Sequence, residues 1–221
     1  MDIIHTTGNT CINKLLDEEK DELFGSARNL YFKAGEGVVK KGASVHDLFL
    51  LKEGTVELIL DEGREKQSLI LLFAGEIIGV NCVYSTKYYR FSALALTDCE
   101  VLVLNYRVFS KLLTNNSGFS MSFIQYISMV NERFLNWHMN LTEKNSAGAL
   151  AFLLCELEKS YGRSSFEIPL TRKDMARVIG FSRESVLKNL ADFRKEGIVE
   201  SEGRTIKILD ADRLHDISTY G

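Results

Sequence analysis

Proline and cysteine are scarce in this chain of 221 residues, and both scarcities restrict what the chain can be. The one proline, Pro169, leaves long stretches free to form helices or strands. The four cysteines, Cys11, Cys82, Cys99 and Cys155, are scattered without a CxxC pair. We therefore expect reduced, buried thiols, with neither a disulfide framework nor a metal site.

Long apolar runs are also missing. No stretch reaches the roughly 18 consecutive apolar residues of a membrane span, and the first residues lack the pattern of a signal peptide. The sequence carries no nucleophile elbow, HExxH, P-loop, or group of His and carboxylates. We therefore expect a cytoplasmic protein without a membrane partner or a cofactor, and an enzyme is the least favoured class.

Positive charge is sparse overall but unevenly placed. The net charge is -3, which by itself disfavours a partner rich in phosphate. Residues 163–213, however, carry 11 Lys and Arg against 9 Asp and Glu, so the C-terminal part is the basic one. The excess is small, so charge alone does not indicate a nucleic-acid partner.

Short apolar or alternating runs separated by glycines fill the N-terminal part, after a short amphipathic helix expected at about 12–26. Such runs are typical of strands, and many of them within about 75 residues indicate an antiparallel barrel or jelly roll. We assign residues 1–115 to this domain. The expected strands are Leu30–Phe32, Leu48–Leu51, Val56–Leu60, Leu69–Phe73, Phe91–Leu96 and Val101–Leu104.

A helical stretch without Gly or Pro runs from Phe119 to Lys144, after Asn105 as a plausible N-cap for the helical region. Apolar residues recur in it at spacings of 4, 3, 4, 3 and 4, which is typical of a heptad seam between two helices. The seam residues are Phe123, Ile127, Val130, Phe134, Trp137 and Leu141. We favour a dimer seam because these side chains, each contributing roughly 1.5–3 kcal/mol when buried, need cover. Packing of the helix on its own barrel is the alternative.

Ser146-Ala147-Gly148 interrupts or bends that pattern, so we place a hinge near 144–148. The dimerisation helix and hinge then occupy residues 116–145, and a DNA-binding domain occupies residues 146–221.

A helix-turn-helix is predicted within this last domain. Thr171 with Asp174 resembles a capping box that starts a helix, and Gly180 suits its end. Ser182 offers an N-cap for a second helix. A hairpin, the wing, follows with its turn at Glu202-Gly203-Arg204.

Charged residues lie on the exposed side of the predicted second helix, near its N-terminus, where such a helix reaches bases. They are Arg183, Glu184 and Lys188. Arg can bind guanine O6 and N7, and Glu can accept from cytosine N4, each pair discriminating by roughly 1–3 kcal/mol. Arg204 and Lys207 of the wing can reach phosphates.

Nearly the whole chain resembles the Crp/Fnr family of bacterial regulators. The segment Phe32-Lys33-Ala34-Gly35-Glu36 and the segment Gly75-Glu76-Ile77-Ile78-Gly79 are similar to parts of that family's cyclic-nucleotide-binding barrel. Ser182-Arg183-Glu184-Ser185-Val186 is similar to its recognition-helix motif. The resemblance implies a homodimer on an inverted repeat near TGTGA, and RNA polymerase as a further partner. It also implies phosphate contacts by Thr171, Arg172, Ser182 and Ser185.

The expected effector pocket departs from the family pattern. Arg90 stands at the position of the family's phosphate-binding Arg. Gly79 belongs to the same expected pocket. Val80, however, replaces the ribose-binding Glu, and Phe91 replaces a small hydroxyl residue. Cyclic AMP is therefore not the expected effector, and Arg90 could instead bridge to an acid of the barrel.

Metal-based sensing is disfavoured by the same scarcity of ligands. An iron-sulfur cluster needs grouped cysteines, and Cys11 alone near the N-terminus does not supply them. Haem would need an axial ligand such as His46, His138 or Cys82. The simpler interpretation is that the histidines lie on the surface and the cysteine in the core.

The sequence thus predicts an α+β protein: a jelly-roll barrel, a long dimerisation helix, and a C-terminal winged helix-turn-helix. A dimeric DNA-binding regulator, with an unidentified effector in the barrel, is the favoured function. A module that binds a small ligand or a protein, without DNA readout, is the alternative.

Overall fold

The computed structural model describes residues 11–62 and 65–221. Contacts divide the chain into two compact units, one extending to Phe134 and the other from Leu135 to Gly221. The division falls inside the long helix α4 (Ser117–Thr142). The domain boundaries expected at 115 and 145 stay a prediction.

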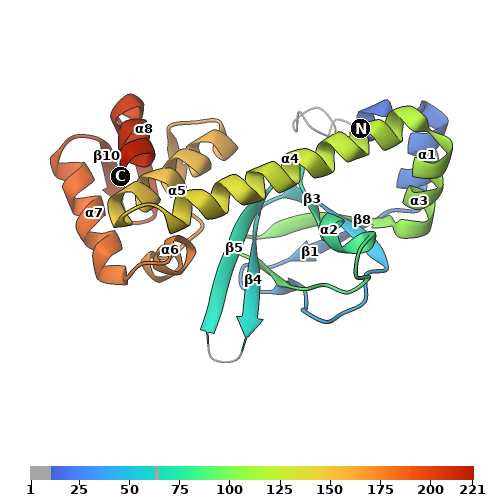
Figure 1. The fold of residues 1–221 in the computed structure, drawn as a ribbon, viewed down its shortest axis with the longest axis horizontal. Helices are drawn as coiled ribbons and strands as arrows, with labels where there is room; N and C mark the ends of the chain where they lie inside the picture. The colour runs from blue at the N-terminus through green and yellow to red at the C-terminus, as the bar shows by residue number, and fades with distance from the viewer. Residues whose placement is uncertain (1–10, 63–64) are drawn as a thin grey trace. The chain divides into compact units, whose positions relative to one another are not determined.

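Two four-stranded antiparallel sheets form the first unit (Figure 1). Their strand orders are β1-β8-β3-β6 and β2-β7-β4-β5. All six expected strands are present; the short β2 and β6 were not expected. The strands are β1 (Arg28–Phe32), β2 (Gly37–Val39), β3 (Asp47–Glu53), β4 (Thr55–Glu62), β5 (Glu65–Phe73), β6 (Ile77–Ile78), β7 (Ser92–Ala95) and β8 (Cys99–Asn105).

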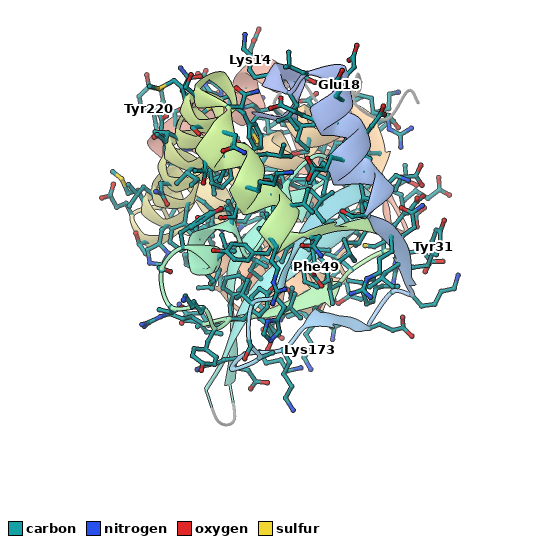
Figure 2. The ribbon with its side chains drawn as sticks, turned by 90° about the vertical axis from the view of Figure 1, so that its right-hand side faces the viewer. Lys14, Glu18, Tyr31, Phe49, Lys173 and Tyr220 are labelled. Atoms are coloured by element: carbon teal, nitrogen blue, oxygen red, sulfur yellow. The ribbon has the colours of Figure 1, made fainter. Side chains whose placement is uncertain are left out.

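Alternation of the side chains turns one face of each sheet inward. In β8 the buried residues Cys99, Val101 and Val103 alternate with half-buried ones. β1 is an edge strand, paired only with β8 among the described strands, and its Tyr31 points outward with 72% of its surface exposed (Figure 2). β4 and β5 continue as a long two-stranded ribbon (Figure 1). The core of the unit therefore lies between the two sheets.

The expected N-terminal helix at 12–26 is divided in the structure. A 3-10 turn, η1 (Cys11–Lys14), precedes α1 (Asp17–Gly25). Leu15 is buried and Leu16 is 67% exposed at the N-cap of α1, so the apolar pattern does not follow one helix face. Further helices of the unit are α2 (Val80–Val83) and α3 (Tyr106–Asn115). Asn105 caps α3 as predicted, because its Oδ1 accepts from the N–H of Arg107 over 2.9 Å.

The stripe that the sequence assigned to a dimer seam is the inward face of α4. Phe123 is 4% exposed and packs against Phe109, with ring centroids 5.1 Å apart. Trp137 is 1% exposed and packs edge-on against Phe152, at 5.5 Å. Val130 and Phe134 line a cavity of the barrel unit. Ile127 and Leu141 are half-buried.

The seam expected from the sequence stays a prediction. Within one chain, the alternative, in which the helix packs on its own chain, accounts for the burial of Phe123 and Trp137. Helix α4 also carries a second apolar stripe, which is exposed: Met121, Ile124, Leu135 and Met139 lie within about 60° of one another around a helix of 3.6 residues per turn. Periodicity alone does not say which of two stripes faces inward.

In the second unit, α4 is followed by a short break at 143–145. Asn145 caps α5 (Ser146–Tyr161), and its Oδ1 accepts from the N–H groups of Ala147 and Gly148. Gly148 therefore lies in the first turn of a helix and does not interrupt one. A Cβ at Gly148 would lie 2.4 Å from the carbonyl carbon of Gly221, so glycine permits this close approach.

The remaining elements of the second unit are helices α6 and α7 and a three-stranded sheet of order β10-β11-β9. The strand β9 and the final helix α8 were not expected. The elements are β9 (Ser165–Glu167), α6 (Arg172–Ile179), α7 (Arg183–Lys195), β10 (Val199–Glu202), β11 (Thr205–Ile208) and α8 (Ala211–Tyr220). The fold is thus mixed helix and sheet, with a jelly-roll unit followed by a winged helix-turn-helix.

Candidate nucleic-acid interface and effector cavity

Side-chain caps stabilise the starts of the two helices of the helix-turn-helix, and a glycine ends the first one. At the start of α6, the Thr171 Oγ1 accepts from the N–H of Asp174 over 3.1 Å, and the Asp174 carboxylate accepts from the N–H of Thr171 over 3.2 Å. Gly180 ends α6 with φ of 74°, a left-handed conformation that suits glycine. Ser182 caps α7, its Oγ accepting from the N–H of Ser185 over 3.1 Å. The predicted caps and turn are all present.

The buried side of α7 holds it against the rest of the unit. Val186, Leu190 and Phe193 are at most 4% exposed. Asn189 is also buried, and its Nδ2 donates to the Oγ of Ser146 at the start of α5 over 3.0 Å. Sequence reasoning missed this bond because 43 residues separate the partners. Packing and this bond set the rotation of α7 and so decide which side chains face outward.

The three predicted base-reading residues, Arg183, Glu184 and Lys188, are all exposed on α7. Hydrogen bonds from its own backbone N–H and from Ser182, with the nearby charge of Arg183, lower the pKa of Glu184. Glu184 is thus an ionised acceptor at neutral pH. A donor and an acceptor stand beside each other at the N-terminal end of the helix, where base edges are reached in the major groove.

The predicted phosphate contacts fall into two groups. The hydroxyls of Thr171, Ser182 and Ser185 lie at the two helix starts, where they also serve the caps. Arg172 lies at the first position of α6 and is half-buried. Its Nη2 donates to the carbonyl oxygen of Gly203 over 3.0 Å, and burial lowers the pKa of its guanidinium. One arm of Arg172 therefore ties α6 to the wing turn.

The wing carries the other two predicted phosphate contacts. Arg204 is exposed in the turn between β10 and β11. Lys207 on β11 lies opposite Glu200 on β10, and the two form an exposed ion pair at 3.4 Å. Such a pair contributes little to stability, about 0–1 kcal/mol, so Lys207 can exchange Glu200 for another anion at small cost.

A cavity of about 210 Å³ lies inside the barrel unit. All four residues of the predicted effector pocket, Gly79, Val80, Arg90 and Phe91, line it. Val80 and Phe91 are buried, while Arg90 is exposed. Among the described residues, Arg90 forms no ion pair with an acidic side chain of the barrel. The Arg90 guanidinium is therefore available to bind an anion.

Helix α4 supplies part of the same cavity, which the sequence analysis missed. Arg133 forms an ion pair with Glu76, donates to the carbonyl oxygen of Leu71 over 2.7 Å, and lies over the ring of Phe73. Both Arg133 and Glu76 line the cavity. An Arg set between the apolar residues Val130 and Phe134 on one helix face is the signal that could have revealed it.

Metal ligands do not gather in the described part of the chain. No group of three or more His, Cys, Asp or Glu residues lies close together there. Burial raises the pKa of the Cys11 thiol to about 12 and that of the Cys155 thiol to about 11, so both are protonated at neutral pH. None of the helices among the described residues is long and apolar enough to cross a membrane.

Comparison with known proteins matches both units. Residues 29–116 match the model of the cyclic nucleotide-binding domain, and residues 148–217 match that of the Crp-like helix-turn-helix domain. The chain belongs to the Crp/Fnr family. This membership makes the protein a DNA-binding transcription regulator.

Curated relatives agree with this assignment. The anaerobic regulatory protein of Bacillus subtilis is 29% identical over 168 residues, 72% of this chain and 70% of the relative. The electron transport regulator A of Shewanella oneidensis is 28% identical over 192 residues, 82% of this chain and 74% of that protein.

Solved structures of the family share the fold. FixK2 from Bradyrhizobium japonicum superposes with a TM-score of 0.78 at 18% identity, over 88% of this chain and 98% of that one. A mutant of CooA from Carboxydothermus hydrogenoformans gives a TM-score of 0.71 at 20% identity, over 99% of this chain and 94% of that one.

Proposed function

We propose that this Crp/Fnr-family regulator acts as a homodimer on an inverted repeat near TGTGA, reading each half-site with α7. The observation that carries the proposal is the exposure of Arg183, Glu184 and Lys188 together on one helix that caps, packing and the Asn189–Ser146 bond hold in place. At position 188, an Arg guanidinium could bind guanine with two hydrogen bonds, whereas Lys188 offers only one ammonium group. We therefore expect the weakest base preference at the base pair that Lys188 contacts.

Phosphate contacts complete the proposed interface. Thr171, Arg172, Ser182 and Ser185 would bind the DNA backbone at the two helix starts, and Arg204 and Lys207 would bind it at the wing. Backbone contacts position the protein without reading sequence. RNA polymerase is the further partner that family membership suggests.

A dimer brings two copies of α7 to two half-sites about one helical turn apart. We assign the dimer seam to the exposed stripe of α4, Met121, Ile124, Leu135 and Met139. These side chains are 55–62% exposed in one chain. Exposed apolar side chains aligned in this way, two before and two after Ser128 and Asn131, favour cover by a second surface, and a second copy of α4 offers the same stripe.

We propose that the cavity binds a small effector other than a cyclic nucleotide. Its volume of about 210 Å³ is smaller than the roughly 300–1,000 Å³ of common small-molecule sites. Apolar side chains dominate its walls, and Arg90 offers one charged group for an anion. Val130, Arg133 and Phe134 belong to both the cavity and α4, so a ligand there would act directly on the proposed dimerisation helix.

The deciding experiment is selection of bound duplexes from a random pool by the full-length protein, followed by titrations of the enriched sequence. Enrichment of an inverted repeat is expected. The Arg183→Ala variant should accept several bases at one position of each half-site, a loss of discrimination of about 1–3 kcal/mol. Arg107→Ala, which removes the same charge from an exposed site of the barrel unit, should leave base choice unchanged. Recovery of no enriched sequence by the unmodified protein would overturn the proposal.

A further inference from the structure

A large apolar side chain stands in the middle of the proposed base-reading face of α7. Leu187 is 45% exposed, whereas the other large apolar residues of the helix, Val186, Leu190 and Phe193, are buried. At 3.6 residues per turn, Leu187 lies about 40° around the helix from Arg183 and about 60° from Glu184. It therefore projects between the two side chains that are proposed to reach base edges.

The residues one turn before Leu187 on this face are charged, and the exposed Ala191 one turn after it is small. Its helical neighbours Arg183, Glu184 and Lys188 are all exposed and charged. Val186, Leu190 and Phe193 form the buried apolar face of α7, and the exposed part of Leu187 lies outside that face. A leucine here leaves apolar surface in water in the free protein, and contact with an apolar group of the ligand would remove that cost.

The major groove of DNA presents one apolar group at its base edges, the C5-methyl of thymine. Phosphates, sugars and the other base edges of the groove are polar or charged. We infer that Leu187 reads a T·A base pair in each half-site through contact with the thymine methyl, beside the pairs read by Arg183 and Glu184. The inference rests on the proposed function, since it requires α7 to lie in the major groove.

Replacement of thymine by uracil tests this contact, because it removes the methyl and keeps every hydrogen-bonding group of the base. The duplex enriched by the unmodified protein would be prepared with each thymine of a half-site replaced in turn by deoxyuridine. One replacement should weaken binding about fourfold, the factor that corresponds to leaving one carbon unburied. In the Leu187→Ala variant the same replacement should have no effect.

Leu209→Ala is the matched control, since Leu209 is 46% exposed and lies outside α7. It should retain the full uracil effect. Leu187→Ala should fold normally, because the side chain is exposed and alanine favours helix. An unchanged uracil effect in Leu187→Ala, the absence of any uracil effect in the unmodified protein, or an enriched half-site without a T·A pair would each overturn the inference. Those outcomes all occur with an enriched sequence in hand, so they differ from failure of the proposed function, in which no sequence is enriched.

Discussion

Arg172, at the start of α6, donates a hydrogen bond to the carbonyl oxygen of Gly203 in the wing turn, over 3.0 Å. The two residues are 31 positions apart, and the bond joins the first helix of the helix-turn-helix to the hairpin that follows the second. The bond places the exposed Arg204 in a fixed relation to α6. The wing is therefore held by a side chain that is also a proposed phosphate contact.

The Arg172→Ala variant should accordingly lose more than a charge. We expect the slope of log K against log salt to fall by about 0.9 for each phosphate that is no longer neutralised, in both Arg172→Ala and Arg204→Ala. Only Arg172→Ala should also destabilise the protein, by about 1 kcal/mol for the missing hydrogen bond. Salt titrations of DNA binding and urea unfolding measure the two effects. Equal stability of the two variants would show that the Gly203 bond contributes nothing.

Asp174 should make the stability of the second unit depend on acid pH. Burial raises its pKa, but hydrogen bonds from Thr171 and Arg177 and the charge of Arg177 more than offset this, so the pKa is lowered from 3.8. A carboxylate whose pKa is lowered by folding stabilises the folded state at any pH above its unfolded-state pKa. This contribution is lost as the pH falls through the pKa of the folded state. We expect Asp174→Ala to lower the free energy of unfolding by about 1 kcal/mol at pH 7. On acidification, the free energy of unfolding of the variant should fall less than that of the unmodified protein.

The measurement is urea unfolding at neutral pH and near pH 3, followed by fluorescence. Trp137 is the only tryptophan in the sequence and packs on Phe152 within the second unit, so its emission reports that unit. Parallel losses of stability in the variant and the unmodified protein on acidification would remove Asp174 as the titrating group.

Trp137 itself should tolerate Phe better than Ala. Its ring is 1% exposed, and its Nε1 is buried without a hydrogen-bond partner. Leaving a buried N–H unpaired costs about 1–3 kcal/mol. Trp137→Phe keeps most of the packing and removes that cost, so we expect a change in stability below about 1.5 kcal/mol. Trp137→Ala should lose about 3–5 kcal/mol. Unfolding followed by circular dichroism checks both, and equal losses would contradict this account of the site.

Local chemistry explains which parts of the fold could be predicted. Thr171, Gly180 and Ser182 act on their immediate neighbours, so the limits of α6 and the start of α7 follow from a few adjacent residues. The short strands β2 and β6 carry too few residues to show a pattern. Arg133 and Asn189 depend on partners 57 and 43 positions away, which only the folded chain brings close.

The two stripes of α4 show the same limit at larger scale. Both are apolar, both recur at helical spacing, and the larger side chains of Phe123 and Trp137 made the inward stripe the more conspicuous one. Which stripe faces the chain depends on the rings of Phe109 and Phe152, which lie outside α4. Tertiary packing thus decides what periodicity leaves open.

Cyclic AMP should not bind in the cavity. Val80 provides no acceptor for a ribose hydroxyl, and the cavity holds about 210 Å³. We expect millimolar cyclic AMP to leave the melting temperature unchanged. Some small, mainly apolar molecules with one negative charge should raise it, and Arg90→Ala should abolish that rise. Arg107→Ala serves as the control for removal of charge. A rise with cyclic AMP in the unmodified protein that Arg90→Ala abolishes would refute the assignment.

Substitution on the exposed stripe of α4 should separate the proposed dimer without unfolding the chain. Leu135 is 62% exposed, so Leu135→Glu disturbs little packing within the chain but places a charge in the proposed seam between two copies. We expect monomers by light scattering, an unchanged circular dichroism spectrum, and loss of binding to the inverted repeat. Met129→Glu is the control, because Met129 is 47% exposed on the same helix but lies about 80° beyond the edge of the stripe. A Leu135→Glu protein of unchanged mass would remove this stripe from the dimer interface, since an apolar seam cannot bury two unpaired carboxylates at small cost.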